Sequence, residues 1–370
     1  MMRQRRRRFW LALHRWLGLS AGLLFVLLGL TGSALCFYQE IDLLLNPLPR
    51  PMAAVTADYR WQPVADALRA NYPDYAGPWR IEVPLAAGRP IVARYYRPPE
   101  RAGRSFAPRL VALDPTTLAV VQDRYWGDFA MTWLFDLHYM LLAGATGRVV
   151  LAWCGAVLLV VLGIGLWLWW PAPGRWRERM RLQLRPGRVR ATYDLHVLSG
   201  VYGLPLLLVL VVTGIVLEVP DTVQPAVALL GPLTRAPDAL PVEPAPLSLD
   251  AALAVARSRF PDSQPRWLET PARDGGVTRI RLERPGEPGR RFPQSTVWVG
   301  SAASPLAVRD IAADSPADRF MAWQHPLHNG EAFGLLGRIA VAGAGLLPLL
   351  LFVSGLLRWR QKCAARAGRD

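Results

Sequence analysis

Four long apolar stretches constrain this chain more than any other feature of its sequence. They cover residues 9–37, 149–170, 197–219 and 339–357, and their central turns contain no Asp, Glu or Lys. A helix needs about 20 apolar residues to cross the hydrocarbon core of a bilayer. The charged content of 19% is also below the roughly 25% of soluble domains. The sequence therefore predicts an α-helical membrane protein with four transmembrane helices.

The positive charge of the chain is concentrated near these stretches. The formal net charge is +15, and basic residues cluster in three segments at 3–8, 175–190 and 358–369. Four alternating spans place all three segments on one side of the membrane, which the positive-inside rule makes cytoplasmic. We expect both termini to be cytoplasmic and the connections around 39–148 and 218–338 to lie outside. Nucleic acid is not expected as a partner, because DNA binding needs such arginines on a folded soluble surface.

The chain is also a tandem repeat. Two sets of residues recur with identical internal spacing, the first after 182 residues and the second after 190: His14, Gly18 and Thr31-Gly32 with His196, Gly200 and Thr213-Gly214, and Trp133, His138 and Gly147-Arg148 with Trp323, His328 and Gly337-Arg338. Repeats of this length indicate two copies of one structural unit. Each copy is predicted to consist of a span, an external domain and a second span.

Both external segments carry the same pattern of elements. A helical pattern near 61–71 and 249–260 comes first in each copy. Segments typical of strands follow at 91–96, 110–113 and 118–124 in the first copy, and at 278–282 and 296–299 in the second. We expect two external α+β domains, each with a helix packed on a small antiparallel sheet.

Four of the five histidines occupy repeat-equivalent positions. His14 and His196 lie near the basic ends of their spans, and His138 and His328 lie outside, shortly before the second and fourth spans. A single histidine at an interface is ordinarily a hydrogen-bonded side chain. Paired polar groups at membrane depth instead tend to face each other inside the bundle, so we expect each pair to share a ligand.

Glycines lie on the same helix faces as two of these histidines. Positions four and eighteen after a histidine return to its face of an α-helix, and Gly18, Gly32, Gly200 and Gly214 occupy them. Such glycines either allow close helix packing or leave room for a flat macrocycle beside the histidine. We predict that Gly18 and Gly200 contribute to a cofactor site.

Haem is the ligand that suits two facing histidines. Zinc needs about four protein ligands, or three and water, and no carboxylate or Cys motif accompanies either pair. A porphyrin supplies four equatorial nitrogens, and two imidazoles complete the octahedron. No Cys-x-x-Cys-His sequence occurs. We therefore predict two non-covalent haem b groups, with His14, His196, His138 and His328 as axial ligands of the iron.

The positions of the two pairs suggest a path for electrons. The 17 residues from His14 to Thr31 span about 26 Å of helix, so the pairs belong to opposite faces of the membrane. A six-coordinate haem has no free position for oxygen chemistry, which leaves one-electron transfer as its role.

Several other residues keep more than one interpretation. His325 has no counterpart in the first copy, where Phe135 stands, and could be an alternative external ligand, a propionate partner, a substrate contact or an interfacial residue without a ligand. Cys36 and Cys154 lie in spans, where packing is the ordinary role, although a disulfide between them is possible. Four arginines either attract an anionic chelate or form a solvated basic face: Arg94, Arg97, Arg101 and Arg104.

Four short motifs resemble those of a known family. They are His14-Arg15-Trp16-Leu17-Gly18-Leu19, Leu113-Asp114-Pro115-Thr116-Thr117, Asp136-Leu137-His138 and Pro326-Leu327-His328-Asn329-Gly330. With them the chain resembles the PepSY-associated transmembrane family over nearly its whole length. The second copy departs from the Asp-Pro-Thr hairpin pattern, with Val299-Gly300-Ser301 in its place.

The resemblance implies a bacterial inner-membrane protein with two PepSY-like periplasmic domains. Some members look like di-haem ferric-siderophore reductases. The expected order is a cytoplasmic tail and first span (1–38), a periplasmic domain (39–132), the His138 segment and second span (133–170), a basic loop (171–195), the third span (196–219), a second periplasmic domain (220–320), the His325/His328 segment and fourth span (321–357), and a basic tail (358–370).

The function expected from these observations is a haem-dependent oxidoreductase embedded in membrane lipid. Electrons from a cytoplasmic reductase or from quinol enter at His14/His196, pass to His138/His328 and reduce a periplasmic ferric siderophore or similar iron chelate. Hard oxygen donors hold ferric iron far better than ferrous iron, so reduction releases the metal. The alternative is a haem-free PepSY membrane scaffold that binds or regulates a periplasmic protein such as a protease. A permease is disfavoured, because the spans offer few polar groups to line a path.

Overall fold

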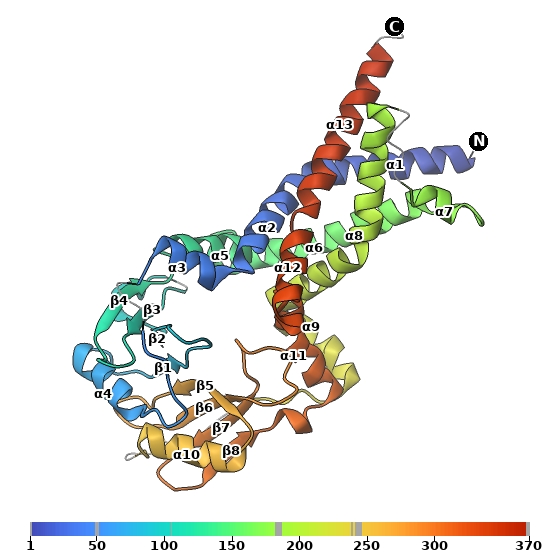
Figure 1. Cartoon of the computed structure of the whole chain (residues 1–370). Helices are drawn as coiled ribbons and strands as arrows, with labels where there is room; N and C mark the ends of the chain where they lie inside the picture. The colour runs from blue at the N-terminus through green and yellow to red at the C-terminus, as the bar shows by residue number, and fades with distance from the viewer. Residues whose placement is uncertain are drawn as a thin grey trace. The chain divides into compact units, whose positions relative to one another are not determined.

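The protein divides into a helical unit and a β-sheet unit in the computed structural model (Figure 1). The structure describes residues 2–48, 52–104, 106–181, 187–237, 240 and 246–367. The helical unit combines Met1–Tyr38, Leu134–Val223 and Gln324–Asp370, and the sheet unit combines Gln39–Trp133 and Gln224–Trp323. Each unit therefore draws on both copies of the repeat.

Three helical segments of the described chain are long and apolar enough to cross a membrane: Gly144–Trp169 (α6), Arg188–Glu218 (α8) and Glu331–Ala367. The last of them contains α12 (Gly334–Ala344) and α13 (Leu347–Ala367). A fourth crossing results if α1 (Met2–Ser20) and α2 (Gly22–Leu35) count as one span, although they meet at a bend of 51°. The prediction of a multi-pass helical membrane protein is confirmed.

These helices form one bundle. α6 packs against both α1 and α8, and α13 packs against both α8 and α2. α2 and the α12–α13 junction approach so closely that a Cβ added at Gly29 would lie 2.2 Å from the carbonyl oxygen of Gly345. Small residues permit such contacts in a membrane, where apolar surface alone does not drive helices together.

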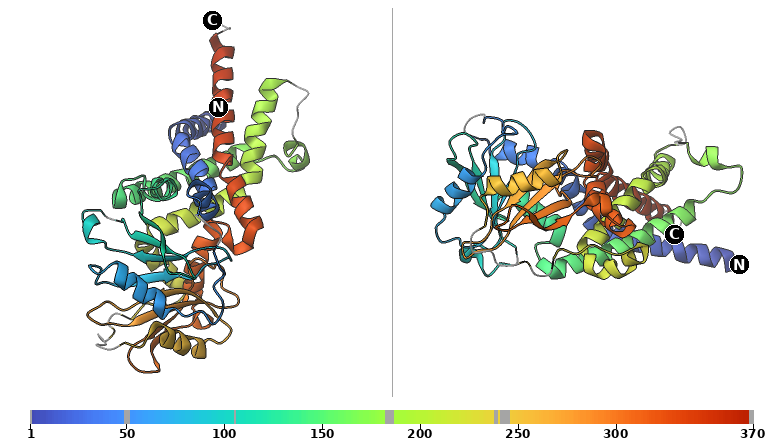
Figure 2. Two further views of the ribbon diagram at one scale, coloured as in Figure 1. Left: turned by 60° about the vertical axis from the view of Figure 1, so that its left-hand side comes forward. Right: turned by 90° about the horizontal axis from the view of Figure 1, so that it is seen from below.

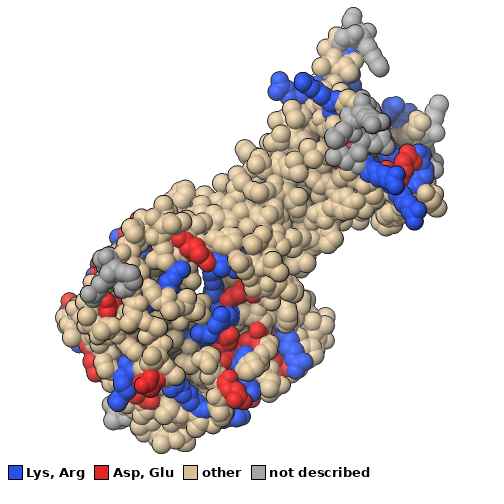
Figure 3. Space-filling model, in the orientation of Figure 1, with Lys and Arg blue, Asp and Glu red and all other residues tan. Residues whose placement is uncertain are grey.

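Basic side chains lie at one end of the bundle. Figure 3 shows them gathered at the end of the helical unit that carries the chain termini, next to a long stretch of the visible face without charged side chains. At the other end, Arg148 donates hydrogen bonds to the carbonyl oxygens of Leu217 and Glu218, and Arg338 donates to that of Cys36. The repeated Gly-Arg pair thus caps the carboxyl end of a span from the other copy in each case.

Short helices complete the two units. α5 (Ala130–Met140) precedes α6, and α11 (Pro316–His328) precedes the last span. The others are α3 (Tyr38–Leu45), α7 (Trp176–Arg179) and α9 (Pro220–Val227).

The sheet unit contains one antiparallel sheet of eight described strands. Their order is β4-β3-β2-β1-β5-β6-β7-β8. The first copy supplies β1 (Trp79–Glu82), β2 (Ile91–Tyr95), β3 (Arg109–Leu113) and β4 (Val120–Tyr125). The second supplies β5 (Gln264–Glu269), β6 (Thr278–Glu283), β7 (Ser295–Val299) and β8 (Pro305–Arg309). β1 pairs with β5, which joins the copies edge to edge.

One hydrophobic core serves both halves of the sheet. α4 (Gln62–Asn71) and α10 (Leu249–Arg259) pack on the same sheet, and residues of both copies share one buried cluster (Figure 1 and Figure 2). Val64 and Leu68 of α4, and Ile81 and Leu268 of the two central strands, are fully buried. Burial of such side chains contributes about 1.5–3 kcal/mol each, so the two copies stabilise each other.

The expectation of two separate external domains is therefore corrected to one domain with two halves. Both expected helices are present, and the five expected strand segments correspond to β2, β3, β4, β6 and β7. The sequence analysis missed β1, β5 and β8. β1 alternates apolar and charged residues over only four positions, Trp79-Arg80-Ile81-Glu82, and β5 contains Pro265 and only two consecutive apolar residues among its six. Their pairing is visible only in three dimensions.

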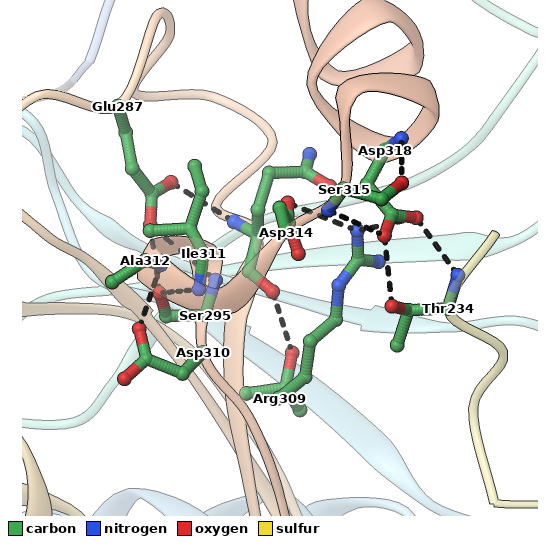
Figure 4. Close-up of polar contacts among 12 residues, drawn as sticks. Thr234, Glu287, Ser295, Arg309, Asp310, Ile311, Ala312, Asp314, Ser315 and Asp318 are labelled. Atoms are coloured by element: carbon green, nitrogen blue, oxygen red, sulfur yellow. Dashed lines mark hydrogen bonds and ion pairs between the residues drawn. The ribbon is translucent and has the colours of Figure 1, made fainter. Parts of the chain in front are cut away.

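The start of α11 is fixed by a buried carboxylate. Asp318 accepts hydrogen bonds from the backbone N–H of Ser315 and from the backbone N–H and hydroxyl of Thr234 (Figure 4). Ser315 in turn accepts a hydrogen bond from the N–H of Asp318, the reciprocal arrangement of a capping box. Next to it, Glu287 binds the N–H and hydroxyl of Ser295 and fixes the loop before β7.

Candidate functional site

The structure brings His14 and His196 together inside the helical unit. His14 lies on α1 and His196 on α8, and their ring centroids are 6.2 Å apart at an interplanar angle of 82°. His14 Nδ1 lies 3.1 Å from the carbonyl oxygen of Val161, and His196 Nδ1 lies 3.1 Å from that of Leu351. Each ring is thus held by the neighbouring span of its own copy.

The second pair, His138 and His328, has the same spacing. Their ring centroids are also 6.2 Å apart, with an interplanar angle of 49°. His138 lies on α5 and His328 on α11. His138 Nδ1 lies 2.9 Å from the hydroxyl oxygen of Thr31, and His328 Nδ1 lies 2.9 Å from that of Thr213. The repeated threonines therefore hold the histidines of the second pair.

These contacts fix which nitrogen carries the proton. A carbonyl oxygen only accepts, so Nδ1 of His14 and of His196 must donate. Thr31 and Thr213 donate their hydroxyl protons to backbone oxygens of their own helices, those of Leu27 at 2.8 Å and Val209 at 2.7 Å. Nδ1 must therefore donate to these hydroxyls as well. All four rings are Nδ1–H tautomers, which leaves Nε2 as the nitrogen with a lone pair available to a metal.

The outer pair is also held in the neutral state. Burial lowers the pKa of His138 and of His328, and the proximity of His328 lowers that of His138 further. A neutral imidazole is the form that binds a metal.

Four glycines lie against the four rings. A Cβ added at Gly165 or Gly355 would lie 3.0 Å or 3.4 Å from Cε1 of His14 or His196. Gly32 and Gly214 stand in the same relation to His138 and His328, at 2.9 Å and 3.2 Å. The helix period predicts that Gly32 and Gly214 face His14 and His196, whereas the structure places them against His138 and His328. Gly165 and Gly355 are not among the predicted residues, although they recur at the offset of 190 residues.

Gly18 and Gly200, the two glycines predicted to line the cofactor site, have different surroundings. Nothing lies within 4 Å of a Cβ added at Gly18, so the face of α1 one turn beyond His14 is open. A Cβ added at Gly200 would contact Leu351 at 3.5 Å. Their predicted part in cofactor binding stays a prediction.

Comparison with known proteins agrees with this architecture. A family model described as the PepSY-associated TM region matches residues 11–362. The chain belongs to this family. No curated protein matches the chain. The match covers all four paired histidines of this PepSY-associated protein and the whole β-sheet unit.

The residues of each pair fit an iron porphyrin. Two imidazoles could hold one iron between their nitrogens at distances of about 2.0 Å each, which would place the ring centres roughly 6 Å apart. Both pairs have this spacing. In the described part of this PepSY-associated protein, no three or more His, Cys, Asp or Glu side chains are placed to hold a metal ion. A metal at either pair would need further ligands from another molecule, which a porphyrin provides.

The remaining predicted residues have contacts of their own. His325 is one turn before His328, and its Nδ1 lies 3.3 Å from the side-chain nitrogen of Asn329. Cys36 and Cys154 form no disulfide within the described chain. Arg101 and Arg104 both bind Asp128, at 2.5 Å and 3.2 Å. These two arginines share one carboxylate and together keep a net positive charge.

Proposed function

We propose that this PepSY-associated protein carries electrons across a membrane through two haem b groups and reduces a ferric chelate. The proposal rests on the arrangement and the hydrogen bonds of four histidines. They form two pairs with ring centroids 6.2 Å apart, and every Nδ1 is used as a donor to the protein. His14, His196, His138 and His328 would hold the two irons through Nε2.

Bound in this way, haem supplies one-electron oxidation and reduction at a six-coordinate iron. The protein residues keep each imidazole in one tautomer and one orientation. A hydrogen bond from Nδ1–H to an oxygen raises the basicity of the ligand nitrogen and fixes the ring plane. The carbonyls of Val161 and Leu351 and the hydroxyls of Thr31 and Thr213 have this role.

The two pairs suit transfer along the bundle. His196 and Thr213 lie on the same helix, 17 residues and thus about 26 Å apart, and Thr213 binds His328. The basic end of the bundle lies on the His14/His196 side. By the positive-inside rule it is cytoplasmic in a bacterial inner membrane, with the sheet unit in the periplasm. A cytoplasmic reductase or quinol would donate at His14/His196, and the chelate would be reduced at His138/His328.

Reduction of a ferric siderophore or a similar chelate is the reaction class that uses such a path. Oxygen donors bind ferric iron strongly and ferrous iron weakly, so one electron delivered outside the membrane loosens the metal without destroying the chelator.

The test is the colour of the purified protein. Chain expressed in haem-replete cells should show the reduced-minus-oxidised spectrum of low-spin b-type haem, with two haems per chain by pyridine haemochrome. His14→Ala and His138→Ala should each retain about one haem, and the double variant none. His325→Ala is the matched control and should retain two.

A second measurement addresses the reaction. Protein reduced under anaerobic conditions should be reoxidised by a ferric siderophore, with release of iron that a ferrous-specific chelator captures. Colourless protein would refute the haem proposal and leave the PepSY scaffold as the function. Red protein that no ferric chelate reoxidises would refute only the choice of substrate.

A further inference from the structure

The sheet face opposite α4 and α10 is rich in arginine. Side chains alternate along a strand, so the neighbours of the buried core residues Ile81, Leu268 and Ile280 point to this other face. We call it the arginine face and define it by Arg80, Glu82, Arg94, Trp267, Glu269, Arg279, Arg281 and Glu283.

In the first half of the sheet, one carboxylate serves two arginines. Glu82 binds Arg80 at 2.5 Å and Arg94 at 3.4 Å. Arg80 stands directly across from Arg94 in the pairing of β1 with β2, and Glu82 stands across from Val92. Both arginines of this half are therefore held by ion pairs to the same carboxylate.

The second half has the same positions but a different pairing. Glu269 and Arg281 lie 187 residues after Glu82 and Arg94, and they occupy the same register positions on β5 and β6. The position of Val92 is taken by Arg279, which stands directly across from Glu269 and binds it. In the first half, Glu82 binds Arg94. In the second half, the equivalent Glu269 binds Arg279 and not Arg281.

Arg281 is left as a surplus cation. Within the described residues it makes no hydrogen bond and no ion pair, and its Nε is buried without a partner. Its guanidinium carbon lies 4.9 Å from the ring centroid of Trp267, over which the guanidinium of Arg80 also lies, at 4.0 Å. Burial, with repulsion from Arg279 and Arg80, lowers the pKa of Arg281 to about 10. Attraction to Glu269 opposes this lowering of the pKa but does not cancel it.

We propose that Arg281 binds a carboxylate group of a small anionic ligand on the second half of the arginine face, formed by β5 and β6. The planar guanidinium presents a fork of N–H donors that matches the two oxygens of a carboxylate. The ligand is small because the neighbouring aromatic frame is closed: Trp267 is 8% exposed, Arg80 is 7% exposed, and Phe292 packs edge-on against the indole at 5.7 Å.

Calorimetric titration of the full chain in detergent with citrate tests the proposal. We expect saturable binding at neutral pH that Arg281→Gln weakens about tenfold or more, because hydrogen bonds to a charged group are lost. Arg94→Gln, at the equivalent position of the first half, is the matched control and should leave the affinity unchanged. Arg281→Lys should restore part of the affinity, since it keeps the charge and loses the fork.

Three results would overturn the site. They are an unchanged affinity in Arg281→Gln, an equal loss in Arg94→Gln, and tighter binding of inorganic phosphate than of citrate. Thermal melting of each variant shows whether it is folded, and a misfolded Arg281→Gln is replaced by Arg281→Lys for the same comparison. The titration requires neither haem nor electron transfer. Its failure would leave the haem spectrum as predicted, and colourless protein would leave the titration unaffected.

Discussion

The hydroxyl oxygen of Thr213 lies 2.9 Å from Nδ1 of His328, and the hydroxyl proton is committed to the carbonyl oxygen of Val209. Thr31 and His138 have the same relationship in the other copy. A threonine in a span thereby determines the protonation of a histidine on a different helix. The lone pair of the histidine is left at Nε2, where it can bind a metal.

Replacement of this hydroxyl should weaken one haem site. Thr213→Val removes the hydroxyl that lies 2.9 Å from Nδ1 of His328, and loss of such a partner typically lowers metal affinity about 10–100-fold. We expect one of two haems to be lost more easily on dilution or competition with apomyoglobin. Ser20→Ala is the control, because the hydroxyl of Ser20 also donates to carbonyl oxygens of its own helix, those of Trp16 and Leu17. Equal haem retention in both variants would contradict the role of Thr213.

The absence of a side chain at Gly32 should also be important for haem binding at the His138/His328 pair. A Cβ there would lie 2.9 Å from Cε1 of His138, closer than side chains tolerate, so Gly32→Ala should displace the ring. The expected result is loss of the same haem that His138→Ala loses, with no additional loss in the double variant. Gly163→Ala on α6 is the matched control, since a Cβ there meets nothing within 4 Å. Additive loss in the double variant would separate Gly32 from the His138 site.

The carboxylate of Asp318 should make the sheet unit sensitive to acid. Burial alone would raise its pKa, but hydrogen bonds from Thr234 and Ser315 outweigh burial and hold the pKa of Asp318 below its ordinary value. A carboxyl group with a pKa lower in the folded protein than in the unfolded chain stabilises the fold at every pH above its unfolded-state pKa, which is near 4. This stabilisation is lost as the pH falls from there through the pKa of the folded state.

Asp318→Asn should therefore lower the free energy of unfolding by about 1–3 kcal/mol at pH 7 and reduce its dependence on pH below 4. Denaturant unfolding of the full chain, followed by circular dichroism at several pH values, measures both. The exposed Asp262→Asn serves as the control and should change neither. A variant as stable as the wild type at pH 7 would show that the contacts of Asp318 contribute nothing.

Removal of the charge at Arg281 should stabilise the protein. Arg281 carries a buried Nε without a partner, so Arg281→Met should raise the free energy of unfolding by on the order of 1 kcal/mol. Glu82→Gln should have the opposite effect, because it removes the carboxylate that binds Arg80 and Arg94. Thermal melts of the two variants provide the comparison. A destabilised Arg281→Met would mean that Arg281 contributes to stability and that its cation is compensated.

For the candidate site, the sequence predicts which histidines pair but not which residues hold them. The pairing of His14 with His196 and of His138 with His328 follows from the repeat alone, because equivalent residues face each other across a two-fold arrangement. The repeat also singles out Thr31 and Thr213, but not their partners. A helix period relates residues on one helix, whereas these threonines reach histidines on helices 107 and 115 residues away in the chain. Only packing reveals such contacts.

Several individual strands of the sheet can be predicted from the sequence, but the pairing of the two copies into one sheet cannot. Strands such as Ile91–Tyr95 are short apolar segments between turns, which local patterns identify. The central strands carry charges on one face because the arginine face satisfies them with ion pairs, as between Arg80 and Glu82. Local alternation over so few residues does not distinguish a central strand from a loop. The pairing of Ile81 with Leu268 could not be read from either copy by itself.

The pairing of β1 with β5 has a consequence for the origin of this duplicated chain. Each histidine pair takes one ring from each copy, and the sheet is completed only where the two copies meet. A polypeptide of half this length would hold one ring of each pair and an unpaired β1 edge. Such a half could build the whole arrangement only as a symmetric homodimer, with both histidine pairs on the dimer axis. The covalent duplication then converts a concentration-dependent association into an intramolecular one, and it leaves each half free to diverge, as Val92 and Arg279 have done.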